Sequence, residues 1–521
     1  MLKNYADQNT AKELAEGFQF GFRLGYEGPR IGGETTNLKS VSDHLDETKS
    51  KIQSEVELGR ISGPFDSKPI TNLRVSPIGL VPKADGKWRL ITHLSFPDNQ
   101  GVNHFIDPDK CSVTYASLDQ ALELITTMGK RTQLAKMDVK SAFRLLIIHP
   151  GDFDLLGFKF EGKYYIDKCL PMGCAMSCCL FEKFATFLQW ELERRTGLDT
   201  VFHYLDDFLF LGHAGSDECT RLMEGFTDLS DHIGLPLAHD KTVGPATKIV
   251  FLGLEIDTDD MVVRIPPDKV DQLKSLLNFA MVKRSLRLKE IQSLVGSLNF
   301  FSKGVPNARA FNRRFYDATS GIKKSHHHIK ITEDLKQDIR MWLYFLENFN
   351  GVRLIHDKEW ISNHNINLYT DSSGNSSLGC GAYCNGSWCF WQWPTDWEEE
   401  TFKEMSFLEL VPILLSISLW GQKLFKNKKI IMHTDNQALV SIINKQTSKS
   451  KRVMMLVRKM VLLLLENNIM FKAQHIYGKV NNIADALSRK QFQKFRTLAP
   501  NADQDPEPIP IEFQVAMLGV K

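Results

Sequence analysis

The chain of 521 residues carries 64 lysines and arginines against 62 aspartates and glutamates, so its formal net charge is only +2. Hydrophobic residues make up 43% of it and charged residues 24%, which excludes a wholly disordered chain and leaves room for roughly three to four folding units. The nine cysteines form no C-x-x-C pair, and no apolar run approaches the roughly 20 residues that span a bilayer. We therefore expect free thiols, no membrane partner and an intracellular chain, cytoplasmic and able to be nuclear, that is not secreted.

The first 60 residues predict amphipathic helix and connector, with no visible catalytic residue. Residues 74–94 contain two apolar runs separated by Ala84-Asp85-Gly86, which is the pattern of a β-hairpin. This hairpin would present the cationic side chains of Lys83 and Arg89.

Two further segments place carboxylates in strongly apolar surroundings. Asp138 lies inside a predicted strand, where a lone carboxylate is costly unless it is paired or binds a metal. Asp206 and Asp207 lie at the predicted hairpin tip of YLDDFLF and repel each other unless a cation lies between them. A solvated Asp-Asp turn is the commoner explanation of that pair alone. Together the three acids would suffice to hold two Mg²⁺ ions for in-line phosphoryl transfer.

From residue 265 to about 342 the apolar spacing predicts helices, and at Ile366 the pattern changes to three short strands, NLYTD, LGCGAYC and SWCFWQW. A helix, the strand IIMHTD, two helices, the strand IMFKAQHI and a helix near Asn482 then predict an αβ layered domain. The last segment, NADQDPEPIPIEF, has four acids, three prolines and no Lys or Arg, and predicts an extended or disordered tail.

Positive charge is concentrated in two segments of this nearly neutral chain. Residues 421–460 hold ten Lys or Arg against one acid, a net +9, and residues 301–330 hold seven against one, a net +6. Such segments indicate a polyanion partner, with a solvated helix face as the alternative for each.

A second set of acids is spread over the predicted αβ domain. Asp371 and Asp435 each end a strand, so they meet at one end of the sheet if the two strands are neighbours. Glu409 lies on an otherwise apolar helix, and Asp485 follows His475 by ten residues. For each acid taken alone, the alternative to a catalytic role is a helix cap or a solvated strand end.

KMDVKSAFRLLIIHP, LPMGC, YLDDFLF and FLGLEID, in this order, resemble the palm motifs of a reverse transcriptase. The resemblance implies that Asp138, Asp206 and Asp207 bind the metals, that Phe143 excludes a 2′-hydroxyl, and that Lys83 and Arg89 hold the incoming triphosphate. It also implies contacts to nucleotide, template or primer from a further set of residues: Met172, Gly173, Tyr204, Phe251, Leu252 and Gly253. Met172 stands where many relatives carry Gln or Phe, and Gly173 would permit close approach to the nucleotide.

The four later acids with His475 resemble a ribonuclease H active site. The resemblance implies that Asp371, Glu409, Asp435 and Asp485 hold two Mg²⁺ ions that activate a water against an RNA phosphodiester. It further implies that His475 helps product release or proton transfer from a loop made flexible by Gly478, and that the +9 segment binds the hybrid.

The two resemblances together cover about residues 60 to 490 and imply an α+β multidomain chain. A right-hand polymerase (fingers, palm, thumb) would be followed by a ribonuclease H-like α/β domain with a mixed five-stranded sheet. The boundaries we expect are 1–60 for an N-terminal helical extension, 61–264 for fingers and palm, 265–345 for a helical thumb or connection, 360–491 for ribonuclease H and 492–521 for the tail.

The implied function is RNA-directed DNA polymerase with ribonuclease H activity, using two Mg²⁺ per site, with Mn²⁺ as a substitute. The implied partners are an RNA template, a DNA primer, an RNA–DNA hybrid and deoxynucleoside triphosphates. NLKS, GPF, HLSFPDNQGVN, FEKFATFLQW and IGLPLAHDKT resemble DIRS-like, tyrosine-recombinase retrotransposons most. The alternatives are a catalytically inactive domesticated nucleic-acid-binding relic, and the same enzyme from a gypsy-type element or a pararetrovirus.

Overall fold

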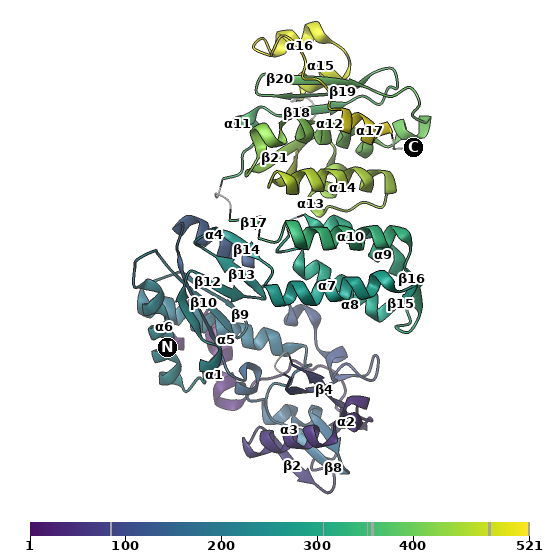
Figure 1. Cartoon of the computed structure of the whole chain (residues 1–521). Helices are drawn as coiled ribbons and strands as arrows, with labels where there is room; N and C mark the ends of the chain where they lie inside the picture. The colour runs from purple at the N-terminus through teal and green to yellow at the C-terminus, as the bar shows by residue number, and fades with distance from the viewer. Residues whose placement is uncertain (84–85, 306, 352, 356–358, 478–480, 519–521) are drawn as a thin grey trace. The chain divides into compact units, whose positions relative to one another are not determined.

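The computed structural model describes residues 1–83, 86–305, 307–351, 353–355, 359–477 and 481–518 (Figure 1). The chain divides into two compact units. The first comprises residues 1–124 and 131–249, and the second comprises residues 125–130 and 250–521.

The first unit is built around a four-stranded antiparallel sheet. The strand order is β11 (Val243–Ala246), β6 (Gln133–Asp138), β10 (Asp207–Gly212) and β9 (Val201–Tyr204). Helices α5 (Met176–Thr196) and α6 (Glu218–Ile233) pack on this sheet (Figure 1). The apolar face of α6 turns Phe226 inward, where its ring lies 4.5 Å from that of Phe208 on β10.

A second, mixed sheet of five strands completes this unit, in the order β1 (Gly33–Glu34), β3 (Arg74–Val75), β7 (Gly157–Phe160), β8 (Lys163–Asp167) and β2 (Ile61–Phe65). The predicted hairpin is present as β4 (Ile78–Pro82) paired antiparallel with β5 (Trp88–Thr92). Residues 84 and 85 of its predicted turn lie outside the described residues.

The N-terminal residues form the expected helices, α1 (Gln8–Phe20), α2 (Lys39–Asp43) and α3 (Leu45–Glu57). They are not a separate extension, because the residues that follow α1 pack into the core of the unit. Phe22 and Leu24 are buried in the same core as the sheet strands. The buried carboxylate of Asp152 accepts a hydrogen bond from the Leu24 amide and forms ion pairs with Arg23 and Arg30. The first 60 residues therefore belong to the core of the unit.

The second unit begins with the sheet β12 (Lys248–Phe251), β13 (Leu254–Asp257), β14 (Val262–Arg264) and β17 (Arg353–Leu354). Its helical part follows the predicted apolar spacing and contains α7 (Pro267–Val282), α8 (Leu288–Phe301), the 3-10 helix η7 (Ala308–Asn312), α9 (Arg313–Thr319) and α10 (Glu333–Asn348). A small hairpin, β15 (Ser285–Arg287) with β16 (His328–Lys330), joins them. Helix α4 (Leu118–Met128) spans the boundary of the two units along the chain.

The later part of the second unit contains five strands of mixed direction, arranged in two ladders (Figure 1). The antiparallel ladder is β18 (Tyr369–Ser372), β19 (Gly379–Cys384) and β20 (Ser387–Gln392), and the parallel ladder is β21 (Lys429–Thr434) and β22 (Met470–His475). Strand β21 lies beside β18. The helices are α11 (Asn363–Ile366), α12 (Met405–Trp420), α13 (Gln437–Lys445), α14 (Lys451–Glu466) and α15 (Asn482–Ser488).

Helix α12 continues into a π-helical turn, η9 (Gly421–Phe425). By length and composition, the stretch Met405–Phe425 is long and apolar enough to cross a membrane. It is longer than the uninterrupted apolar run that the sequence shows. Because 78% of its most apolar window is buried inside the protein, a core helix explains the same composition, and the stretch is weak evidence for a membrane span.

Residues 503–510 form neither helix nor strand, as an extended tail would, but the segment that contains them is ordered at both ends. Helices α16 (Phe492–Leu498) and α17 (Ile511–Leu518) form, and Phe495 is buried against Trp388 of β20. The indole of Trp388 donates to the Asp503 carbonyl. Two aromatic residues, Phe495 and Phe513, pack this acidic segment against β20. The overall composition of the segment, rich in acids and prolines, gives no sign of this packing.

Candidate functional site

Three of the predicted acids converge in the four-stranded sheet of the first unit. Strand register places Asp138 of β6 directly opposite Asp207 of β10. Asp206 occupies the tip between β9 and β10, beside Leu205, whose φ of 54° lies in the left-handed region. The amide of Val139 donates to the Asp206 carbonyl at 2.9 Å, which ties this tip to the end of β6.

Burial, with a smaller contribution from neighbouring charges, disfavours the ionised form of Asp206 and Asp207. Burial raises the pKa of Asp206 to about 6, and the charges of Asp138 and Asp207 add to the effect. Burial also raises the pKa of Asp207, with Asp138 again contributing. Asp138, which is 6% exposed, accepts hydrogen bonds from Lys241 Nζ on both of its oxygens at 3.0 Å.

Buried carboxylates of one sign fit hard divalent cations, which take oxygen ligands. The side chains do not form a closed ligand set as they stand. Among the residues that the structure describes, no group of three or more His, Cys, Asp or Glu is arranged to hold a metal ion. Lys241 pairs with Asp138, so a cation bound at this carboxylate would have to compete with the ammonium group.

The predicted nucleotide-binding residues of the first unit take two kinds of position. Lys83 and Arg89 are exposed on the β4–β5 hairpin. Phe143 is half-buried, and its ring meets that of Phe181 edge-on at 5.7 Å.

The LPMG turn shows why a glycine occurs there. The Thr92 amide donates to the Met172 carbonyl, and Gly173 has a φ of +117°. A β-carbon at Gly173 would lie 2.2 Å from the Thr92 carbonyl oxygen. We expected the glycine to allow a nucleotide to approach the backbone. In the structure, the backbone of Gly173 already lies so close to β5 that a side chain would clash with it.

Tyr204 and the FLG turn complete the polymerase residues predicted from sequence. The Tyr204 ring lies 4.7 Å from that of Tyr115, a partner that sequence reasoning missed. Within the second unit, Phe251 is only 2% exposed, so its ring belongs to the core. Leu252 and Gly253, with φ of 48° and 75°, form the partly exposed turn between β12 and β13.

The second set of acids also converges, at one end of the β18–β21 pair. Asp371 lies on β18, Glu409 on α12, Asp435 directly after β21 and Asp485 on α15. Burial raises the pKa of Asp371 to about 7, with Asp485 and Asp435 adding their charges. Burial raises the pKa of Glu409 well above its usual range, and the charges of Asp371 and Asp435 contribute. As in the first cluster, burial and neighbouring negative charges disfavour the ionised acids, which a bound cation would offset.

Helix α15 brings further side chains that sequence reasoning did not name. Ser488 Oγ donates to Asp371 Oδ2, and Arg489 pairs with Asp485 at 2.6 Å. Asn481 donates to the Thr370 carbonyl and thereby fixes the start of the helix against β18. The spacing of Asp485, Ser488 and Arg489 puts them on one helix face, which is a signal that the sequence does contain.

His475 ends β22 and is paired in register with Thr434, the residue before Asp435. It is exposed at the same strand end as that acid. Gly478, which we expected to loosen the following loop, lies outside the described residues.

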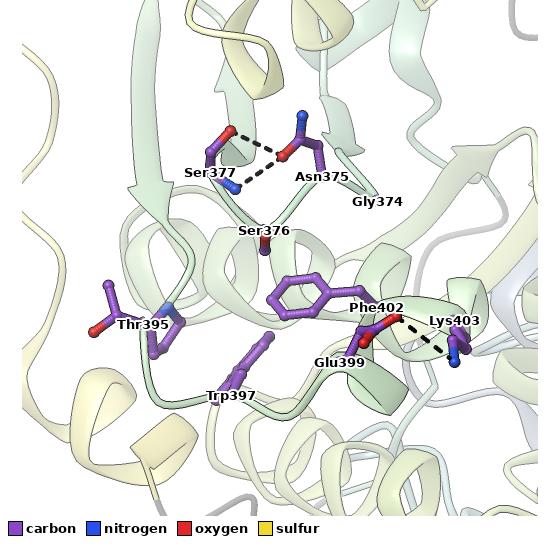
Figure 2. Close-up of a pocket in the computed structure, with 10 residues that line it drawn as sticks. Gly374, Asn375, Ser376, Ser377, Thr395, Trp397, Glu399, Phe402 and Lys403 are labelled. Atoms are coloured by element: carbon purple, nitrogen blue, oxygen red, sulfur yellow. Dashed lines mark hydrogen bonds and ion pairs between the residues drawn. The ribbon is translucent and has the colours of Figure 1, made fainter.

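A pocket of about 620 Å³ opens beside the loop that follows β18. Figure 2 shows Asn375–Ser377 facing the rings of Trp397 and Phe402 across it. The loop is held in place because the Trp393 indole donates to the Ser373 carbonyl at 2.8 Å, two residues after Asp371. The pocket therefore has an aromatic wall and a polar rim, and the four predicted acids are not among the residues that line it.

Known proteins match both the sequence and the fold. Residues 81–256 match the family model of the reverse transcriptase (RNA-dependent DNA polymerase). Protein P of Duck hepatitis B virus (strain Germany/DHBV-3) is 31% identical over 314 residues, 53% of this chain and 39% of its own length. The Gag-Pro-Pol polyprotein of Human T-cell leukemia virus 3 (strain 2026ND) is 26% identical over 269 residues, 51% of this chain and 17% of its own length.

Two solved structures share the fold. The foamy viral protease-reverse transcriptase in complex with RNA/DNA hybrid has a TM-score of 0.51 at 16% identity, covering 98% of this chain and 64% of that chain. A foamy viral protease-reverse transcriptase in complex with double-stranded DNA has a TM-score of 0.51 at 18% identity, covering 86% and 72%. The chain spans less than half of the length of these two viral relatives, and within it residues 81–256 form a reverse transcriptase domain.

Proposed function

We propose that this chain is an RNA-directed DNA polymerase that also hydrolyses the RNA strand of RNA–DNA hybrids. The observation that carries the proposal is the presence of two separate clusters of buried carboxylates, around Asp206 and around Asp371, each with a raised pKa. Buried acids of one sign are stabilised by bound cations, and both reactions act on phosphates.

In the polymerase site, Asp138, Asp206 and Asp207 would hold two Mg²⁺ ions. In both sites the bound ions would lower the pKa of the attacking oxygen and offset charge that develops on the phosphate, with Mn²⁺ as a substitute. Lys241 neutralises Asp138 when no ion is bound and would have to release it on binding. This exchange keeps the pocket folded in both states, because the buried carboxylate always has a cationic partner.

The remaining polymerase residues bind and orient the substrate. Lys83 and Arg89, exposed on one hairpin, present two cations to the triphosphate of a deoxynucleotide. The half-buried ring of Phe143 would exclude a 2′-hydroxyl, since its contact with Phe181 limits how far it can move. An RNA template and a DNA primer complete the substrates.

In the nuclease site, Asp371, Glu409, Asp435 and Asp485 would hold the ions. Ser488 and Arg489 orient Asp371 and Asp485 from one face of α15. His475, exposed at the strand end next to Asp435, is placed to move a proton or to help the product leave.

A pair of isosteric substitutions tests the proposal. We expect Asp206→Asn to abolish Mg²⁺-dependent primer extension on an RNA template while hybrid cleavage continues. Asp371→Asn should do the reverse, because each change removes a carboxylate from only one cluster. The readouts are labelled-primer extension and cleavage of a labelled hybrid, with wild type as the reference. If both variants keep both activities, the assignment of the metal sites is wrong.

The second candidate is a catalytically inactive nucleic-acid-binding relic. It is favoured by the pairing of Asp138 with Lys241 and of Asp485 with Arg489, which leaves neither acid ready to bind an ion. Salt-sensitive binding of a hybrid without Mg²⁺-dependent turnover by the wild type would establish it.

For the source of the chain we propose a DIRS-like retrotransposon that encodes a tyrosine recombinase. The support is the set of sequence segments that includes HLSFPDNQGVN and IGLPLAHDKT. A tyrosine recombinase gene beside the coding sequence is the expected finding. A zinc-dependent integrase there would indicate a gypsy-type element instead.

A further inference from the structure

A buried arginine stands directly beside the residue that we expect to select the sugar of the incoming nucleotide. Arg144 follows Phe143 in the 3-10 helix η4 (Ala142–Leu145). The side chain of Arg144 is only 13% exposed, and arginine is rarely buried unless it is paired. Its partners therefore help to decide where this part of the polymerase site lies.

Two carboxylates from distant parts of the first unit hold the guanidinium of Arg144. One oxygen of Glu55, on α3, accepts from Nε at 2.9 Å and lies 2.9 Å from Nη2. Asp167, at the end of β8, accepts from Nη1 at 2.7 Å. Glu55 also forms an ion pair with Arg60, at 3.5 Å. The network therefore contains two cations and two carboxylates, and its charge is balanced.

Burial makes this network hard to separate. The side chain of Asp167 is 10% exposed, and burial raises its pKa, while the charge of Arg144 acts against that rise. Removing one partner from a buried ion pair leaves a buried charge without compensation, which is far more costly than the loss of an exposed pair. Helix α3 packs on β2, the neighbour of β8 in the five-stranded sheet (Figure 1). The guanidinium is therefore fixed between α3 and β8.

The same guanidinium reaches the segment that leads into the LPMG turn. Its Nη1 lies 3.4 Å from the carbonyl oxygen of Cys169 and 3.5 Å from that of Leu170. Leu170 is two residues before Met172, which we expect to contact the nucleotide or the template. One side chain thus connects the turn that carries Phe143 with the turn that carries Met172.

The backbone and the ring of Phe143 are restrained on more than one side. The Leu146 amide donates to the Phe143 carbonyl at 3.2 Å. The Arg144 amide donates to the carbonyl of Ser141, whose φ of 60° lies in the left-handed region, at 2.7 Å. The Phe143 ring meets the ring of Phe181 on α5. What remains of the freedom of Phe143 depends on the short helix that the Arg144 side chain holds in place.

We propose that Arg144 is a positioning residue for sugar selection, because its pairing with Glu55 and Asp167 fixes Phe143 where its ring excludes a 2′-hydroxyl. The inference rests on the proposed function. The sequence resemblance gives a role to Phe143 and none to its three supporting residues. Steric exclusion requires a ring that stays in place, since a displacement of about 1 Å can change a rate by about 100-fold. Through Glu55, the N-terminal helix α3 takes part in substrate choice without touching the nucleotide.

The geometry explains why this position requires an arginine and not simply a positive charge. The guanidinium presents five N–H donors in one plane, and here it faces two carboxylates and two backbone carbonyls. A lysine ammonium carries the same charge on one nitrogen, so it cannot reproduce contacts that are spread over Nε, Nη1 and Nη2. Arg144→Lys therefore keeps the charge and loses the positioning.

The test measures sugar selection by variants of the full chain. The kcat/KM for adding one nucleotide to a primer on an RNA template, with Mg²⁺, is determined for a deoxynucleoside and for a ribonucleoside triphosphate. The variants are Arg144→Lys and the isosteric Glu55→Gln. The control is Glu47→Gln, the same change at an exposed position of α3. Circular dichroism checks folding, and Glu55→Gln decides alone if Arg144→Lys does not fold.

Both network variants should discriminate less against the ribonucleotide. Groups that share one network affect each other by about 2- to 150-fold. We expect the ratio of the two kcat/KM values, deoxynucleotide over ribonucleotide, to fall about 5-fold in Glu55→Gln and about 20-fold in Arg144→Lys. The fall should come from a lower KM for the ribonucleotide, a gain that a merely destabilised protein does not show. The control should keep the wild-type ratio.

A double variant tests whether the effect acts through Phe143. Phe143→Val alone should remove most of the discrimination. Adding Glu55→Gln to it should then change the ratio by less than about 2-fold, because a ring that is absent cannot be displaced. The inference is overturned by an unchanged ratio in the network variants, by an equal fall of both kcat/KM values, or by an additive effect in the double variant.

Failure of this inference is distinguishable from failure of the proposed function. If the wild type extends primers and the network variants keep its ratio, the role of Arg144 is rejected and the polymerase assignment stands. If the wild type extends no primer with any nucleotide, the polymerase assignment is rejected, and the inference is rejected with it.

Discussion

Because the carboxylate of Asp206 is buried, we expect it to affect the free energy of unfolding as well as the activity. Its pKa is raised from the ordinary 3.8 to about 6, chiefly by burial. An acid with a raised pKa in the folded state stabilises the fold fully below its unfolded pKa, and this stabilisation is lost as the pH rises through the folded pKa. In the absence of metal, wild-type stability should therefore fall between about pH 4 and pH 6 relative to a variant without this acid.

The size of the effect follows from the shift. About two pKa units at 1.36 kcal/mol each give about 3 kcal/mol as an upper value. For a unit of this size, that corresponds to a rise in Tm of about 6–12 °C for Asp206→Asn above pH 7. The difference should vanish near pH 4, where the carboxyl group is neutral in both folded and unfolded chains.

The assay is thermal unfolding in EDTA from pH 4 to pH 8, comparing wild type, Asp206→Asn and a control, Asp228→Asn, at an exposed position on α6. The control should match the wild type at every pH. Adding Mg²⁺ should then stabilise the wild type more than Asp206→Asn, because the proposed ion site requires all three carboxylates. If Asp206→Asn is no more stable than wild type at pH 8, or if the difference does not change with pH, the electrostatic reasoning about this cluster is wrong.

Two further substitutions test the packing around the sites. Gly173→Ala places a β-carbon 2.2 Å from the Thr92 carbonyl at a φ of +117°, so it should destabilise the first unit by about 1–3 kcal/mol, measured by urea unfolding, and reduce primer extension while hybrid cleavage persists. A variant as stable and active as wild type would show that the turn can move. Phe495→Ala empties a buried site against Trp388 and should cost about 3–5 kcal/mol in the second unit, and an unchanged urea midpoint would mean that the C-terminal segment does not stabilise it.

Local pattern was sufficient to predict the elements that carry most of the candidate residues. The alternation of apolar residues around Asp138 and Asp207 predicted strands, and the structure pairs these two acids in register. The sequence predicted that Asp371 and Asp435 meet only if their two strands are neighbours, and the structure places β21 beside β18. Strand periodicity and the position of an acid in it are local properties, so a sequence reveals them directly.

Three features were not accessible in this way. The ion pair between Lys241 and Asp138 joins residues about a hundred positions apart in the sequence. The sequence around neither residue indicates that the two are partners. Gly173 was attributed to nucleotide approach, whereas β5 also requires it. The C-terminal segment was judged by its charge and prolines, but Phe495 and Phe513 fix it to β20.

By itself, the sequence determined the type and order of the acidic and basic side chains and the strands and helices that carry them. Only the tertiary structure decided that basic residues from two distant segments of the sequence line one cavity, and that Asp138 and Asp371 have partners on other elements, Lys241 and Ser488. The reason is physical, because periodicity records which face of an element is buried, while the identity of the facing element depends on long-range packing.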